Sequence, residues 1–274
     1  MHYSEFIPPP SLQRVVRCIW ELRASAETQA PVERVLPDGC GEIIINLADP
    51  FTERVGVAFM RQPRVLVVGQ LRRFLDIAAT GCVDLIGIRC EPTGLRSLLG
   101  VSAAELTDQR VDLAVVSRGL QRRLLAAARV AGLHARRQAL LRVLCAAVND
   151  GRGPHSWLPT ALCEIERSQG RAGVRQLARS VHCSDRQLER VFRDEVGMTP
   201  KVYARIVRFQ SVLRRHVVGR SWAELAVECG YSDQAHLIRD FRSFAGVAPA
   251  AYFRGDHVLS DHFTGQGSAT RADS

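Results

Sequence analysis

The sequence predicts an α+β protein with a β-rich N-terminal domain, a helical connector and an all-α C-terminal domain that holds two helix-turn-helix units. Three observations support this division. Residues 1–112 alternate short apolar runs with proline and glycine, residues 113–150 carry leucine at helical spacing, and residues 174–252 contain one pattern twice. A chain of 274 residues has room for two domains of ordinary size.

Residues 1–112 are expected to form a barrel or jelly roll, because many short strands separated by turn residues are typical of these folds. Pro37-Asp38-Gly39 and Ala79-Thr80-Gly81 are turn sequences. A helix is expected at Gly94–Leu99, and another from Ala103, where Ser102 and Glu105 form a capping box. The candidate strands are Val15–Leu22, Glu33–Leu36, Glu42–Leu47, Arg54–Phe59, Val65–Val68, Phe74–Ala79 and Val83–Arg89.

The N-terminal domain has the residues for an apolar pocket but not for a metal centre. Trp20, Phe59 and Phe74 would line such a pocket and hold an organic effector of unknown identity, although aromatic residues in a barrel are more often plain core. His2 is the sole histidine before His134, which argues against a histidine-based metal site. We expect no metal and no cofactor.

The eight cysteines suggest an alternative mode of control. They lack the close Cys-x-x-Cys pairs of a zinc site and are expected to be free thiols. A thiol that senses oxidants or electrophiles must be accessible and have a lowered pKa. Cys40, between Gly39 and Gly41 in a turn, is the best candidate for a thiol sensor.

The connector, residues 113–150, is expected to form two helices that break near Gly132. Its leucines would face the N-terminal domain or the second subunit of a homodimer, and its arginines would form a solvated face. Residues 149–154 are rich in glycine and have the composition of a linker. The C-terminal domain then covers residues 157–254, and residues 255–274 are expected to be a disordered tail.

The first copy of the repeat predicts a helix-turn-helix. Leu177, Ala178 and Val181 share one apolar helical face, and Ser184 with Gln187 forms a capping box for the next helix, which Gly197 ends. That second helix buries Leu188, Val191 and Phe192. Its exposed side carries Arg186, Gln187, Glu189, Arg190 and Arg193.

The second copy follows at an offset of 48 residues up to the Ser-Asp pair and 49 beyond it. Ser221 and Glu224 form a capping box, and Ser232 or Asp233 caps the second helix. This helix buries Leu237, Phe241 and Phe244. Its exposed side carries Gln234, Ala235, His236, Arg239 and Arg242.

A single helix is expected to join the two copies. Thr199-Pro200 is a helix start, and an apolar stripe continues to Gly219. At about 1.5 Å per residue this helix would be roughly 28 Å long, close to the roughly 34 Å between successive major-groove faces of DNA. The stripe consists of Val202, Ile206, Phe209, Leu213 and Val217.

The charge distribution favours a polyanionic partner. The formal net charge is +9, and it is concentrated in residues 113–142, with seven basic and no acidic residues, and in residues 171–254, with fifteen basic and eight acidic residues. No transmembrane run and no signal peptide is evident, so we expect a cytoplasmic protein without membrane contact. An enzyme in the N-terminal barrel is the competing class, but no acid–base pair, nucleophile constellation or phosphate loop supports it, and we expect no catalytic residues.

Residues 157–254 resemble the DNA-binding domain of the AraC/XylS family of bacterial transcription regulators. The motifs are Leu177-Ala178, Ser184-Asp185, Pro200-x-x-Tyr203, Arg208-Phe209, Gly230-Tyr231-Ser232-Asp233-Gln234 and Pro249-x-x-Tyr252. The resemblance implies that the second helix of each unit enters the major groove of double-stranded DNA, and it makes RNA polymerase an expected partner. Arg186, Glu189 and Arg190 would face bases in the first unit, and Gln234, His236 and Arg239 in the second.

Weaker motifs make residues 1–112 similar to the sensor domains of some AraC-type regulators. They are Pro8-Pro9-Pro10, Cys18-Ile19-Trp20, Pro37-Asp38-Gly39-Cys40 and Ile88-Arg89-Cys90-Glu91-Pro92. The resemblance implies a cupin-like barrel that holds a small effector or mediates dimerisation. Ala235 departs from the family pattern, in which a polar residue is frequent, and this weakens the case for base reading by the second unit.

Overall fold

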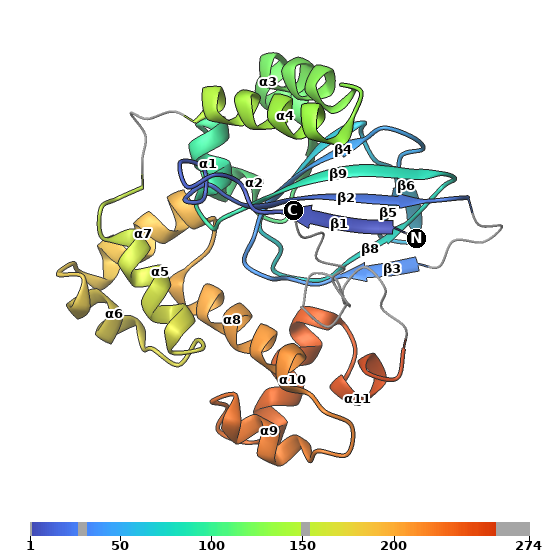
Figure 1. Cartoon of the computed structure of the whole chain (residues 1–274). Coiled ribbons are helices and arrows are strands. Elements are labelled where there is room, and N and C mark those ends of the chain that lie inside the picture. Colours follow the sequence, from blue (N-terminus) through green and yellow to red (C-terminus); the bar gives the residue numbers. More distant parts are fainter. Residues whose placement is uncertain (1, 27–31, 149–153, 256–274) are drawn as a thin grey trace.

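The computed structural model describes residues 2–26, 32–148 and 154–255. Two β-sheets form the N-terminal domain, two long helices cover it on one side, and the remaining helices lie on another side (Figure 1). The six-stranded sheet has the order β1-β2-β9-β4-β7-β10, and the four-stranded sheet the order β3-β8-β5-β6. The strands are β1 His2–Phe6, β2 Val16–Ala24, β3 Val32–Val35, β4 Glu42–Asn46, β5 Thr52–Val55, β6 Ala58–Arg61, β7 Val65–Val68, β8 Leu75–Ala78, β9 Val83–Cys90 and β10 Arg110–Asp112.

The two faces of the six-stranded sheet serve different cores, because successive side chains of a strand point to opposite faces. One face, with Ile43, Ile45, Ile86 and Ile88, packs in one cluster with leucines of the covering helices. The other face carries Trp20, Leu22 and Leu85 and meets the four-stranded sheet. The interior between the two sheets is therefore separate from the core beneath the helices.

The predicted α+β class is confirmed, with corrections to single strands. The single strand expected at Arg54–Phe59 is wrong: β5 and β6 form an antiparallel hairpin that turns at Gly56, where φ is 63°. Strands β1 and β10 were not predicted. Of the three aromatic residues expected to line a pocket, Trp20 faces the interior, whereas Phe59 is 40% exposed and Phe74 packs against the C-terminal core.

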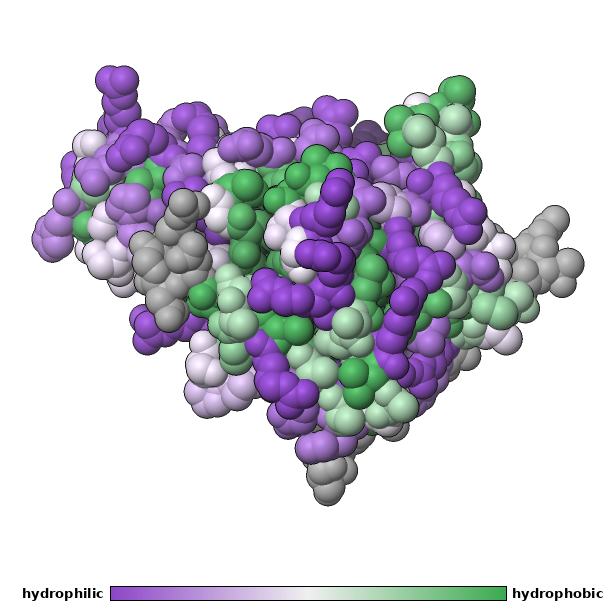
Figure 2. Space-filling view, turned by 90° about the horizontal axis from the view of Figure 1, so that it is seen from above, coloured by the Kyte–Doolittle hydropathy of each residue, from purple (hydrophilic) through white to green (hydrophobic). Residues whose placement is uncertain are grey.

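The connector consists of α3 (Leu113–Ala128) and α4 (Leu133–Ala147), which break at Gly132 as expected. Leu120, Leu124, Leu140 and Leu144 are buried against the six-stranded sheet. Figure 2 looks onto this side and shows hydrophilic side chains projecting over hydrophobic ones. Before the connector lie the short helices α1 (Gly94–Leu99) and α2 (Ala103–Leu106), and Ser102 Oγ accepts from the Ala104 N–H rather than from that of Glu105.

The C-terminal domain is all-α and has one core. Its helices are α5 (Leu158–Arg167), α6 (Val174–Ser180), α7 (Asp185–Val196), α8 (Pro200–Arg215), α9 (Trp222–Glu228), α10 (Gln234–Ala245) and α11 (Pro249–Tyr252). Leu36 of the N-terminal domain is buried in the same core. Most of the expected linker and nearly all of the expected tail lie outside the described residues.

Candidate nucleic-acid interface

Helices α6 and α7 form the first helix-turn-helix. Ser184 Oγ accepts a hydrogen bond from the Gln187 N–H at 3.2 Å, as the capping sequence predicts. Leu177 and Ala178 of α6 and Leu188 and Phe192 of α7 are buried together. This packing turns the opposite side of α7 to the solvent.

The exposed side of α7 carries the residues expected to contact DNA. Arg186, Gln187, Arg190 and Arg193 are exposed, and Glu189 is partly exposed. Arg193 Nη2 lies 3.0 Å from Glu189 Oε2, one helical turn away. An exposed pair of this kind is weak, so both side chains can exchange this contact for DNA at little cost.

Helices α9 and α10 repeat the arrangement. Ser221 Oγ accepts from the Glu224 N–H at 3.2 Å, and Asp233, not Ser232, caps α10 by accepting from the His236 N–H at 2.7 Å. That backbone hydrogen bond lowers the pKa of Asp233, which keeps the cap ionised. Leu237, Phe241 and Phe244 are buried as predicted.

The exposed side of α10 presents Gln234, Arg239 and Arg242 to the solvent. His236 is only partly exposed, since its Nδ1 lies 3.1 Å from Ser232 Oγ and its ring packs edge-on against Tyr231. A base contact by His236 therefore requires its ring to leave these neighbours. Gln234, Arg239 and Arg242 need no such rearrangement.

Helix α8 joins the two units. Tyr203 packs against Phe192 of α7, and Phe209 packs against Phe241 and Phe244 of α10 with ring centroids 5.1 and 5.2 Å apart. The expected length is wrong, because α8 ends at Arg215 and Val217 lies outside it, 63% exposed. Sixteen residues give a helix of about 24 Å rather than about 28 Å.

The N-terminal domain holds the carboxyl ends of both exposed helices through three hydrogen bonds that we call the interdomain clamp. Thr107 Oγ1 donates to the Gly197 carbonyl at 2.6 Å, the Phe74 N–H to the Phe244 carbonyl at 2.8 Å, and Arg34 Nη1 to the Ala245 carbonyl at 2.9 Å. A fourth bond reaches α8 itself: Gln210 Nε2, which is buried, donates to the Pro37 carbonyl at 2.7 Å.

The clamp explains why both repeats have glycine at the same place. Gly197 and Gly246 end their helices at φ of 90° and 75°, a region that favours glycine. A Cβ at Gly197 would lie 2.5 Å from Thr107 Oγ1, and one at Gly246 would lie 2.2 Å from Phe74 Cε1. Each glycine therefore ends a helix, and because it has no Cβ it leaves room for a side chain of the N-terminal domain.

Cys40 does not have the environment expected of a thiol sensor. It is 6% exposed, and burial raises the pKa of its thiol to about 12. The turn is covered rather than accessible, because a Cβ at the preceding Gly39 would lie 2.9 Å from the Tyr203 ring. The expectation of an accessible, easily ionised thiol at Cys40 is therefore wrong.

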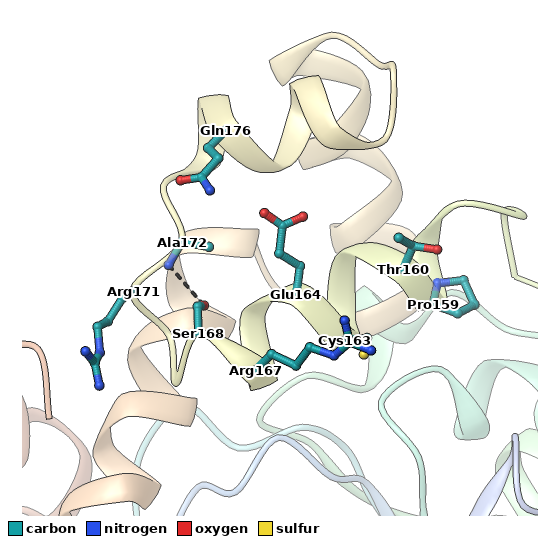
Figure 3. A pocket seen from close by; sticks show the side chains of 9 residues that line it. All are labelled: Pro159, Thr160, Cys163, Glu164, Arg167, Ser168, Arg171, Ala172 and Gln176. Atoms are coloured by element: carbon teal, nitrogen blue, oxygen red, sulfur yellow. Dashed lines mark hydrogen bonds between the residues drawn. The ribbon is translucent and has the colours of Figure 1, made fainter.

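A broad surface hollow of about 870 Å³ follows α5 and the start of α6 (Figure 3). Two of its polar side chains are engaged within the domain: Ser168 Oγ accepts from the Ala172 N–H at 3.1 Å, and Glu164 accepts from Ser180 at 2.5 Å. None of the residues expected to bind DNA lines this hollow. We assign it no ligand.

Within residues 2–26, 32–148 and 154–255, no group of three or more His, Cys, Asp and Glu side chains is placed to hold a metal ion. Over the same ranges, no helix combines the length and the apolar character needed to cross a lipid bilayer.

Two family models match the chain. Residues 4–112 match one described as a domain of unknown function (DUF6597), and residues 177–255 match one described as a helix-turn-helix domain. The second match begins within α6 and covers α7 to α11. Residues 177–255 are an AraC-type helix-turn-helix domain. The resemblance of the C-terminal motifs to this family is thereby confirmed.

Among solved structures, this chain is similar to ToxT from Vibrio cholerae. A 1.65 Å structure of ToxT has a TM-score of 0.46 and 8% identity, with 93% of this chain and 98% of that chain covered. An unsaturated fatty acid-bound ToxT from strain SCE256 has a TM-score of 0.43 and 11% identity, with 91% and 94% covered. Similarity at this level does not indicate which ligands this chain binds. No curated protein is a significant match.

Proposed function

We propose that this protein is a sequence-specific, DNA-binding transcription regulator whose N-terminal barrel responds to a small effector. One observation carries the proposal: two AraC-type units, joined by a shared helix, each expose a basic face on their second helix. In this proposal residues 1–112 are the sensor, residues 113–150 the connector and residues 157–254 the DNA-binding domain. No catalytic role is assigned to the barrel.

The exposed residues divide by role. Arg186, Glu189 and Arg190 read bases in the first unit, and Gln234, His236 and Arg239 in the second. An arginine pairs with guanine edges, whereas a carboxylate accepts from cytosine. Gln187, Arg193 and Arg242 lie beside them and bind the backbone, which sets the register without reading sequence.

Binding to DNA from the region upstream of the protein's own gene tests the proposal. We expect the affinity of the full chain to fall by at least tenfold between 50 and 200 mM salt, because phosphate contacts release counterions. Fluorescence anisotropy at several salt concentrations measures this slope. An affinity that is constant over the same range would contradict a phosphate-bound interface.

The interdomain clamp is the proposed link between effector and DNA. It touches the carboxyl ends of α7 and α10, so a change in the barrel alters how the two reading helices are held. Thr107→Val removes one donor and leaves the Gly197 carbonyl without its partner, at an expected cost of about 1–3 kcal/mol.

We expect wild-type protein to unfold in one thermal transition and a Thr107→Val, Gln210→Leu double variant in two, because the domains then unfold separately. Differential scanning calorimetry resolves the transitions. Thr52→Val is the matched control, since the Thr52 hydroxyl bonds to Ala78 within the N-terminal domain. Two transitions in that control, or one in the double variant, would contradict the proposed coupling.

The remaining partners are proposals that follow from this role. A regulator of this kind acts in the cytoplasm and contacts RNA polymerase. The connector is the proposed surface for a second copy, since Val115 and Leu133 are 82% and 49% exposed on it. Analytical ultracentrifugation of the wild type and of Leu133→Glu tests this, and an unchanged sedimentation coefficient in the variant counts against this surface.

A further inference from the structure

A cavity of about 70 Å³ lies between the two sheets of the N-terminal barrel. Its walls are mostly apolar and include Leu22, Phe51, Leu66 and Leu75. The polar side chains that line it are those of Glu42, Asn46 and Gln62. No Lys, Arg or His of the described chain is among its lining residues.

The polar atoms still open to a ligand are acceptors. Glu42 Oε1 accepts from Trp20 Nε1 at 3.3 Å and from Arg89 Nη1 at 3.1 Å, but its Oε2 accepts from no described residue. Asn46 is 1% exposed, and its Oδ1 is buried without a hydrogen-bond partner in the described chain. Gln62 already donates to Glu53 at 3.0 Å. A ligand that fits this cavity should therefore carry a hydrogen-bond donor.

The surroundings of Glu42 suit a cation. The Glu42 side chain is 16% exposed, and burial raises its pKa to about 7 while the hydrogen bond from Trp20 opposes that rise, so a cation bound beside it would favour the ionised form. The Trp20 ring also lines the cavity, and an aromatic face attracts cations. An anion brought to the same place would meet a carboxylate and two acceptor oxygens, so carboxylic acids are disfavoured.

We propose that this cavity binds a short aliphatic amine, whose ammonium group donates to Glu42 and whose carbon chain lies among the apolar side chains. The inference rests on the proposed role of the barrel as an effector domain and names the class of the effector. A cavity of about 150 Å³ admits benzene, so 70 Å³ has room for roughly three or four non-hydrogen atoms. This size favours amines of two or three carbons.

The position of Glu42 also connects the ligand to the DNA-binding domain. Arg89, which donates to Glu42, also pairs with Asp38 in the turn before β4. The neighbouring Pro37 carbonyl accepts from Gln210 of α8. An ammonium that competes with Arg89 for Glu42 is thus linked to the helix that joins the reading units through Arg89, the Pro37-Asp38 turn and Gln210.

Titration of the full chain, without DNA, with n-propylamine, propan-1-ol and propionate tests the proposal. The readout is the ¹H–¹⁵N signal of each tryptophan indole, because the chain has three tryptophans and only the Trp20 indole donates to Glu42. We expect propylamine to shift the Trp20 signal saturably and propionate to leave it unchanged. Glu42→Gln should weaken propylamine binding at least tenfold, and Glu105→Gln, an exposed carboxylate on α2, should not.

Three outcomes would overturn the proposal: a propionate shift as large as that of propylamine, equal shifts of all three indoles, or loss of binding in Asn46→Leu with none in Glu42→Gln. The comparison of propylamine with propionate uses wild-type protein, so it stands even if a variant fails to fold. Because DNA is absent, a chain that binds propylamine but no DNA would refute the proposed function alone. A chain that binds DNA but no amine would refute the ligand class alone.

Discussion

Replacing Phe209 with alanine is expected to lower the free energy of unfolding of the DNA-binding domain by about 3–5 kcal/mol. The side chain is fully buried on α8 and packs against Phe241 and Phe244 of the second unit. A domain of this kind is stable by only about 5–15 kcal/mol, so the loss removes a large share of its stability. DNA binding should fall with the folded fraction.

Urea denaturation followed by circular dichroism measures this loss. Phe59→Ala is the matched control, since Phe59 is 40% exposed on the β5–β6 hairpin and its removal leaves no cavity. We expect the control to cost less than about 1 kcal/mol. Equal losses in the two variants would show that Phe209 does not hold the second unit to α8.

Arg89→Leu is expected to destabilise the N-terminal domain by about 3–5 kcal/mol. Arg89 is 6% exposed and donates to both Asp38 and Glu42, so the variant leaves two carboxylates in a poorly solvated place without their cation. Burial is costly for a charge that has lost its partner. The turn that carries Pro37 should then become less ordered, and the hydrogen bond from Gln210 to the Pro37 carbonyl should weaken.

The matched control is Arg72→Leu, because Arg72 is 55% exposed and pairs with Asp108 at the surface. An exposed pair of this kind contributes less than about 1 kcal/mol. Adding Glu42→Gln to Arg89→Leu should restore part of the stability, since one of the two uncompensated charges is then removed. If the double variant is as unstable as Arg89→Leu alone, the uncompensated charge of Glu42 does not cause the loss of stability.

The C-terminal helices could be predicted from the sequence because their signals are local. Ser184, Thr199 and Ser221 each accept from a backbone N–H three residues on, as their spacing indicates. The end of α8 was misplaced because an apolar residue, Val217, continues the helical period after the helix has ended. Periodicity alone does not distinguish a buried position from an exposed one.

The environment of Cys40 and the interdomain clamp could not be predicted, because they depend on contacts between residues far apart in the sequence. Cys40 lies beside Gly39, which is covered by Tyr203, and Thr107 reaches Gly197 ninety residues away. The sequence around Gly39 is that of an exposed turn. Tyr203 of the other domain covers Gly39 and Leu95 of α1 covers Gly41, and the local pattern carries no information about either contact.

Selection of DNA from a randomised pool tests the central claim most directly, namely that α7 and α10 read bases from their exposed faces. Wild-type protein should enrich two half-sites with centres about 10–10.5 base pairs apart. Arg190→Ala should relax the preference at one or two positions of one half-site and Arg239→Ala in the other, by roughly 1–3 kcal/mol of discrimination per base pair. Arg193→Ala should weaken binding to all sequences alike. If all three variants return the wild-type preference, these helices are not the base readers.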